Sequence, residues 1–275
     1  IVRRKGHDWI RLTRRWTMTA WLALSLGMVL GSRWAYEELG WGGYWAWDPV
    51  ENASLMPWLT ATAFIHSVMV QERRGMLKRW NVVLVALTYF LSVFGTFLTR
   101  SGILSSVHTF VESDIGPLFL GFMGLIAAFS LYFIIDRRDL LQDERFVESY
   151  ASREFGFVLN NLILVGLSFA VFWGTVFPLV SRLFGVEVTV AAPYFNRITA
   201  PLFLVLIVLM GVVPLLGWGR STWKAVGMQV TVPLGMALAS CAALYAGGIR
   251  ETGFLLAVAG AATIDSHARS PDVMR

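Results

Sequence analysis

The stretch PLFLGFMGLIAAFSLYFII, residues 117–135, contains no charged side chain. A helix of about 20 apolar residues spans the roughly 30 Å hydrocarbon core of a bilayer, so this stretch is a candidate transmembrane helix. The rest of the chain has the same character, since 56% of its 275 residues are hydrophobic and only 15% are charged. A soluble domain carries about 25% charged residues. The composition therefore excludes a soluble globular enzyme, a disordered tail and a collagen-like rod.

Comparable apolar stretches recur along the chain and alternate with polar connectors. They lie at residues 16–36, 55–71, 80–99, 117–135, 157–181, 199–217 and 227–247. This pattern predicts an all-α fold, a polytopic integral membrane bundle of about seven transmembrane helices.

Arg and Lys gather in every second connector, where sixteen of them lie, against five in the connectors between. The basic connectors are residues 1–15, 71–79, 136–153 and 218–225. The positive-inside rule then places the N-terminus in the cytoplasm. The loops expected on the far side are residues 37–54, 100–116, 182–198 and 248–252. Because the net charge of +5 arises from these flanks, no nucleic-acid partner is expected.

The two ends of the chain look unlike those of a complete protein. The chain starts at Ile1, and the apolar run at 253–262 is too short to span before it meets the polar residues 263–275. The start predicts an internal piece of a longer protein, and the end predicts either a truncation or altered reading frame or a native tail. The single Cys241 excludes an intramolecular disulfide, a CxxC pair, a cysteine zinc site and a CxxCH haem-attachment box.

Tryptophan is concentrated in one short segment. Residues 34–58 hold five of the twelve tryptophans, namely Trp34, Trp41, Trp45, Trp47 and Trp58. One interpretation is an aromatic belt at the membrane interface. The other is a platform for a large flat ligand such as a porphyrin, since three glycines between the tryptophans let the backbone approach a ligand closely. Composition alone leaves both open.

Two carboxylates follow the tryptophans. Asp48 stands at an N-cap position, Pro49 at the first helical position and Glu51 three residues after the cap. This spacing predicts a capping box that starts a helix. A catalytic carboxylate pair is the alternative.

Two of the four histidines are candidate ligands. His66 lies inside an apolar span, where an ionisable side chain is costly and usually faces a cavity, a ligand or another helix. It is either a neutral histidine bonded to a neighbouring helix, or a haem ligand or proton relay. His108 lies in an outer loop, where a solvated side chain is the ordinary case. His7 and His267 have no companion at metal-binding spacing.

The string WGGYWAWDPVENASLMPWL, residues 41–59, resembles the WWD domain of haem-handling membrane proteins. Its DPVENAS portion, and the FLTRSG stretch at 97–102 that leads to His108, are similar to the CcmF family. Members of this family are haem lyase subunits of the multi-component cytochrome c maturation system. The resemblance covers residues 1–260 and would correspond to the middle of a protein roughly twice this length.

The resemblance implies roles for individual residues. In CcmF a membrane-embedded b-type haem has two histidine ligands, of which His66 matches one. The WWD segment holds a second haem on the outer face between two exterior histidines, of which His108 matches one. The partner of each histidine is expected outside this chain. Arg100 either neutralises a haem propionate or anchors its helix at the interface. The expected haem-binding residues are His66, His108, Trp41, Trp45, Trp47, Asp48, Trp58 and Arg100.

The resemblance also implies an activity and partners. The chain is expected to be a membrane subunit of a thioether-forming haem lyase, with haem b as cofactor, although its catalytic residues are not identified. Expected partners are haem, apocytochrome c, the haem chaperone and apocytochrome thiol-reducing subunits, and quinol. The expected location is the bacterial inner (plasma) membrane, multi-pass.

The apolar runs, the charge pattern and the resemblance together divide the chain into segments. These are a basic cytoplasmic lead with the first span (1–36), a periplasmic WWD segment (37–58), spans with an outer histidine loop at 100–116 (59–135), a cytoplasmic loop (136–156), C-terminal spans (157–262) and a polar tail (263–275).

Two other functions stay open. One is a secondary transporter or haem exporter with a buried histidine, although no repeat symmetry is visible. The other is an inert fragment that needs its missing ends.

Overall fold

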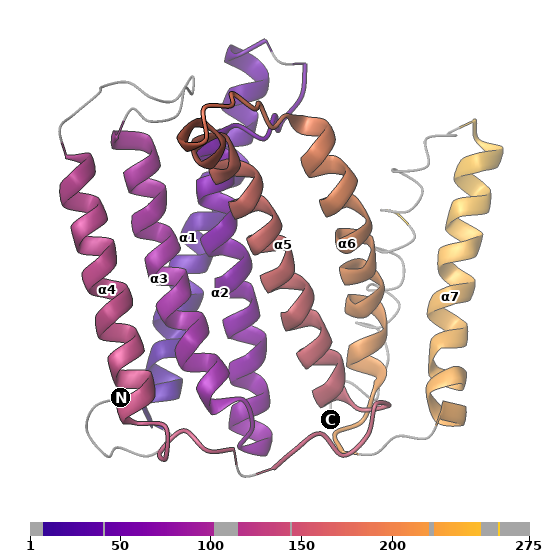
Figure 1. The fold of residues 1–275 in the computed structure, drawn as a ribbon. Helices are drawn as coiled ribbons and strands as arrows, with labels where there is room; N and C mark the ends of the chain where they lie inside the picture. The colour runs from indigo at the N-terminus through magenta and orange to yellow at the C-terminus, as the bar shows by residue number, and fades with distance from the viewer. Residues whose placement is uncertain are drawn as a thin grey trace. The chain divides into compact units, whose positions relative to one another are not determined.

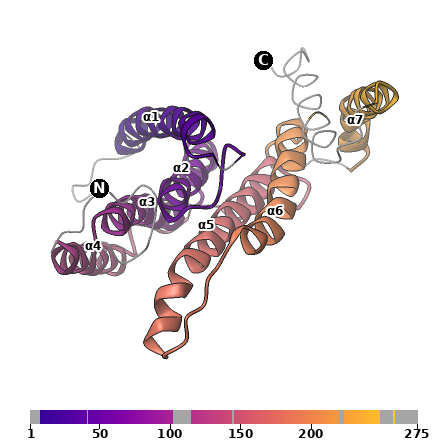
Figure 2. The ribbon, with the colours of Figure 1, turned by 90° about the horizontal axis from the view of Figure 1, so that it is seen from above.

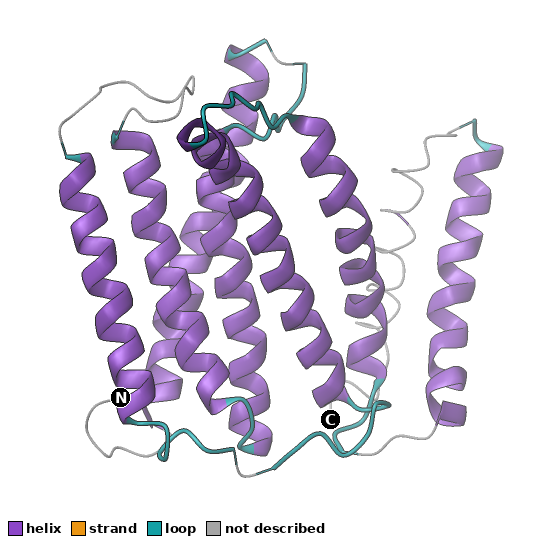
Figure 3. Cartoon of the chain, in the orientation of Figure 1, coloured by secondary structure: helices purple, strands orange, loops and turns teal. Residues whose placement is uncertain are grey.

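The computed structural model describes residues 8–40, 42–101, 115–143, 145–219, 223–248 and 258. Within these residues every regular element is a helix, which confirms the all-α prediction (Figure 3). The elements are α1 (Asp8–Glu38), α2 (Pro49–Arg74), α3 (Lys78–Arg100), α4 (Gly116–Asp136), α5 (Arg153–Leu183), α6 (Ala192–Val212), the short 3-10 helix η1 (Val213–Leu215) and α7 (Trp223–Ala246). The α-helices follow the predicted spans in number and order.

Five of these helices, α2 to α6, are long and apolar enough to cross a membrane. Among the fully described residues of α7, Leu234–Ala246 form an apolar helical stretch. Helix α1 does not reach the same apolarity, because threonines, serines, glycines and Arg33 dilute its aliphatic residues. It still exposes large apolar side chains along its length, including Leu22, Leu26 and Leu30, as a helix in contact with lipid does.

The chain divides into two compact units. The first unit consists of Ile1–Arg145 and Leu164–Thr199, and the second of Phe146–Ile163 and Ala200–Arg275. Helices α5 and α6 each contribute one part to each unit.

Helix α2 is the centre of the first unit. It packs against α1 on one side and α3 on the other, and α4 packs on α3 (Figures 1 and 2). In the most apolar part of each helix, 67% of the α2 residues are buried, but only 11% of the α4 residues are. Most of helix α4 is therefore exposed in this structure, whereas α2 is covered by its neighbours on both sides.

Small and polar residues join α2 to α3. A Cβ at Gly95 would lie 3.3 Å from Ala53, so the two backbones approach closely at that point. The Thr88 hydroxyl donates to Thr60 Oγ1 (2.9 Å). Packing of this kind drives helix association where apolar burial gives no advantage over lipid.

Three basic segments of the first unit lie at one end of its helices. Arg14 forms an ion pair with Glu72. The Lys78 backbone N–H donates to Asp143 (2.9 Å), and the Arg79 guanidinium donates to the carbonyl of Arg138 (3.2 Å). Residues 8–15, 71–79 and 136–143 therefore lie at the same end of the helices of this unit.

In the second unit, the start of α5 is bound to the connector that follows α6. The Arg153 guanidinium donates to the carbonyl oxygens of Leu216 (2.9 Å) and Pro214 (2.5 Å) and lies 5.5 Å from the ring centroid of Trp218. The buried carboxylate of Glu154 accepts from the backbone N–H of Gly219 (2.9 Å). Both charged side chains are thus hydrogen-bonded to the backbone of this connector.

Candidate functional site

The turn between α1 and α2 is fixed by the two carboxylates that follow the tryptophans. Asp48 Oδ2 accepts from the Val50 N–H (2.9 Å), and Glu51 Oε2 accepts from the N–H groups of Ala46 and Asp48 (3.0 Å each). The capping box is complete, with Pro49 at the start of the helix, and the prediction is confirmed. Both carboxylates thus hold the backbone of the turn.

Trp47 is the most constrained residue of this turn. Its backbone has a φ of +61°, a value that bulky residues rarely adopt. Its ring stacks on Phe195 with centroids 4.9 Å apart and planes within 9°. The indole N–H donates to Asn196 Oδ1 (2.8 Å), and the Trp47 carbonyl accepts from the Asn52 amide (3.1 Å). These contacts therefore stabilise a backbone conformation that is unfavourable for a tryptophan by itself.

The contacts of Trp47 rest on buried residues. Phe195 and Asn52 are both almost fully buried. Asn52 Nδ2 also donates to Thr175 Oγ1 on α5 (3.1 Å). A Cβ at Gly174 would lie only 2.7 Å from Phe195, so α5 leaves no space behind that ring. The N-terminal turn of α6 and the middle of α5 thus hold the tryptophan turn from one side.

Trp45 meets Trp47 edge to face, at a centroid distance of 6.0 Å and an angle of 86°. Its indole nitrogen is buried and has no hydrogen-bond partner among the described residues. Trp45 also lines a cavity of about 220 Å³ between α1 and the start of α2, with Gly27 and Gly31 on the opposite wall. A cavity of that size has room for a water molecule to accept from the indole.

Trp58 belongs to a different aromatic pair. It lies inside α2, stacks on Trp21 of α1 at 5.8 Å and donates to Ser25 Oγ (2.8 Å). Trp45 and Trp47 contact each other, whereas Trp58 contacts α1 within the helical layer. Trp45 and Trp47 thus belong to the turn, whereas Trp58 belongs to a pair that packs α2 against α1.

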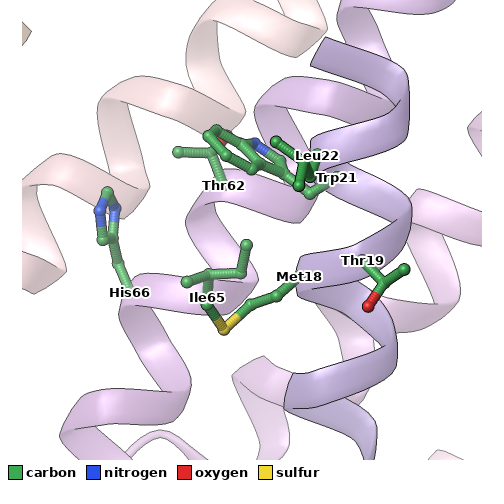
Figure 4. Close-up of a pocket in the computed structure, with 7 residues that line it drawn as sticks. All are labelled: Met18, Thr19, Trp21, Leu22, Thr62, Ile65 and His66. Atoms are coloured by element: carbon green, nitrogen blue, oxygen red, sulfur yellow. The ribbon is translucent and has the colours of Figure 1, made fainter. Parts of the chain in front are cut away.

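His66 lies on α2 at a second cavity, of about 410 Å³ (Figure 4). The cavity is lined by Met18, Thr19, Trp21 and Leu22 of α1 and by Thr62, Ile65 and His66 of α2. Figure 4 shows the imidazole directed away from the Met18 sulfur. Within the parts of the chain that the structure describes, no cluster of three or more His, Cys, Asp or Glu could hold a metal ion.

The residues around His66 suit a haem better than a bare metal ion. A haem needs an apolar slot and an axial nitrogen, not several ligating side chains. The cavity is lined by one imidazole, one indole, two threonines and the apolar side chains of Met18, Leu22 and Ile65, and its volume of about 410 Å³ lies within the range of about 300–1,000 Å³ usual for ligand pockets.

The other predicted site residues lie elsewhere. Arg100 is the exposed last residue of α3, at the helix end opposite Lys78. Trp34 is a partly exposed residue of α1. Trp41 and His108 lie outside the described residues, as do His7, His267 and the polar tail.

Three residues that support the turn were missed in the sequence: Asn52, Phe195 and Asn196. Asn52 could have been suspected, because an amide inside an apolar helix needs a partner. Phe195 and Asn196 gave no such signal, since aromatic and polar residues are ordinary at the start of a span.

Taken together, these features define a multi-pass helical membrane protein with a rigid tryptophan turn and a histidine inside one span. A sequence model of the family described as "Cytochrome C assembly protein" matches residues 4–104. CcmF of Haemophilus influenzae, a cytochrome c-type biogenesis protein, is 42% identical over 82% of this chain. CycK of Bradyrhizobium diazoefficiens is 44% identical over 78% of it. The chain belongs to the CcmF family of cytochrome c-type biogenesis proteins.

A solved structure, the cytochrome c heme lyase CcmF, matches 97% of this chain with a TM-score of 0.73 and 35% sequence identity. The chain spans about a third of the length of the two relatives, 35% and 32% respectively, and 40% of the solved chain.

Proposed function

We propose that this chain is the haem-handling segment of a cytochrome c maturation subunit in the bacterial inner membrane. It binds haem at the tryptophan turn and helps to attach it to the CxxCH thiols of apocytochrome c. The observation that carries the proposal is the rigidity of Trp47, which is held by a stacked ring, a side-chain amide and a capped helix. The family relatives are biogenesis proteins, which favours this function over a transporter.

The proposed attachment reaction requires the protein to orient the two reactants. Each apocytochrome thiol adds across one haem vinyl group, so a C–S and a C–H bond form while the S–H bond and the vinyl π bond break. The step is redox-neutral and uses no cysteine of this chain. What the protein contributes is orientation, which converts an encounter of two molecules into a reaction within one complex. The aromatic faces of Trp45 and Trp47 supply stacking area for that purpose.

His66 is proposed to hold a haem b within the membrane. When bound, this group would supply electrons that keep the outer haem iron reduced, with quinol as a candidate donor. Among the described residues, His66 would hold the group with its imidazole, and the apolar side chains of the cavity would surround it. The outer haem would use His108 and Arg100, and the partners would be apocytochrome c, the haem chaperone and the thiol-reducing subunits.

A reduced-minus-oxidised absorption spectrum of the detergent-purified chain tests the proposal. We expect a b-type haem signal that His66→Ala removes almost completely, because the substitution deletes the axial nitrogen. His267→Ala is the matched control and should keep the signal. His108→Ala should affect only haem at the outer turn. A folded chain without haem, or a His66→Ala variant with an unchanged spectrum, would contradict the proposal.

We also propose that the basic end of the helices faces the cytoplasm and the tryptophan turn faces the periplasm. Cys241 is the only cysteine, so Cys241→Ser gives a background for single-cysteine labelling. Asp139 and Tyr44 are exposed positions on the two ends of the first unit. A membrane-impermeant thiol reagent added to spheroplasts should label Tyr44→Cys and spare Asp139→Cys. The reverse pattern would invert the orientation.

A further inference from the structure

Two tryptophans and two hydroxyl residues form a closed hydrogen-bond circuit between α1 and α2. The Trp21 indole donates to Thr62 Oγ1 (2.8 Å), and the Thr62 hydroxyl donates to the carbonyl of Trp58 (2.7 Å). The Trp58 indole donates to Ser25 Oγ (2.8 Å), and the Ser25 hydroxyl donates to the carbonyl of Trp21 (2.7 Å). We name these four residues the tryptophan clamp. Each hydroxyl accepts from one indole and donates to the backbone of the other tryptophan.

The clamp fixes the planes of both rings. The indoles stack at 5.8 Å with an angle of 23° between them. Rotation of either ring would break the hydrogen bond of its indole N–H, and an unpaired N–H within the helical layer is costly. The rings are therefore held by directional bonds, in addition to van der Waals contact.

Only one half of the clamp meets the His66 cavity. Trp21 and Thr62 line it, whereas Ser25 and Trp58 do not. Thr62 is four residues before His66 on α2, so the two side chains share one helix face. In Figure 4 the Trp21 ring lies beside Thr62 on that face.

Trp21 also differs from the neighbouring tryptophans of its helix. Trp16 is 70% exposed and Trp34 is 44% exposed, as expected of residues in an aromatic belt. Trp21 instead turns toward α2, and its N–H is bonded there. An interfacial-belt role thus fits Trp16 and Trp34 and does not account for Trp21.

We propose that Trp21 and Thr62 are positioning residues of the His66 haem site. The Trp21–Thr62 hydrogen bond holds the indole as a fixed wall of the cavity, against which a haem bound at His66 packs. This inference rests on the proposed function, because it takes haem as the ligand of His66. It adds that α1, which has no predicted ligand, shapes the site.

The symmetry of the clamp provides a matched test. Thr62→Val removes the hydroxyl at the cavity, and Ser25→Ala removes the equivalent hydroxyl on the far side. Each substitution frees one indole N–H, so we expect both to lower the Tm of the purified chain by similar amounts. Only Thr62→Val should also weaken haem retention, by about 3- to 10-fold for one lost hydrogen bond. It should further shift the midpoint potential, and Thr62→Ser should restore wild-type values.

The possible outcomes separate this inference from the proposed function. Equal haem loss in Thr62→Val and Ser25→Ala would show a clamp that only holds helices together. A wild-type haem content and potential in Thr62→Val would overturn the inference while leaving haem binding at His66 intact. A folded wild-type chain that holds no haem would overturn both.

Discussion

Gly174→Val is expected to destabilise the chain by about 1–3 kcal/mol, the usual cost of overpacking a filled core, and to abolish ligand binding at the tryptophan turn. A Cβ at this position would lie 2.5 Å from Tyr194 Cε1 and 2.7 Å from Phe195 Cε1. Contacts below 3 Å force the rings to move. Phe195 stacks on Trp47, so its displacement removes the support of the turn. Thermal unfolding in detergent and haem-stained c-type cytochromes in the native host measure the two effects.

Gly166→Val is the matched control on the same helix. A Cβ at Gly166 meets no atom within 4 Å, so the identical substitution there has room. Its Tm should stay at or above the wild-type value, since valine restricts the unfolded chain more than glycine does. If both variants behaved alike, the effect would come from helix propensity, and the contact between α5 and Phe195 would not support Trp47.

Local features of the fold could be predicted from the sequence because they depend on neighbouring residues. The helices follow from runs of apolar residues of span length, and the start of α2 follows from Asp48, Pro49 and Glu51. A capping box needs only four consecutive positions. The alternation of basic connectors likewise depends on charges beside each span.

Contacts between distant segments could not be predicted in the same way. Trp47 and Asn196 are 149 residues apart, and the sequence around either residue gives no sign that the two form a hydrogen bond. The tryptophan clamp is similar, because Trp21 and Thr62 stand 41 residues apart on different helices. Tryptophans 45, 47 and 58 formed one cluster in the sequence, but helix geometry carries Trp58 along α2 into another set of contacts. Proximity along the chain therefore did not show which of these tryptophans contact one another.

Glu51→Ala is expected to have the largest effect of any single substitution in the turn, about 2–4 kcal/mol from two unpaired backbone donors and a lost cap. Glu51 Oε2 is the acceptor for the N–H groups of both Ala46 and Asp48, which flank Trp47 on either side. Without this oxygen the turn loses the bonds that hold Trp47 at positive φ. We expect a lower Tm, loss of ligand at the turn and no mature c-type cytochrome in the native host, while haem at His66 is retained.

Glu51→Gln distinguishes a structural carboxylate from a catalytic one. Glutamine keeps an acceptor oxygen at the same reach but cannot exchange a proton, so a capping role predicts stability and cytochrome yield close to wild type. A general acid or base would instead lose activity in both variants, because neither alanine nor glutamine titrates. A Glu51→Gln variant that folds with wild-type Tm but matures no cytochrome would therefore reverse the assignment, and Glu51 would become a reacting group.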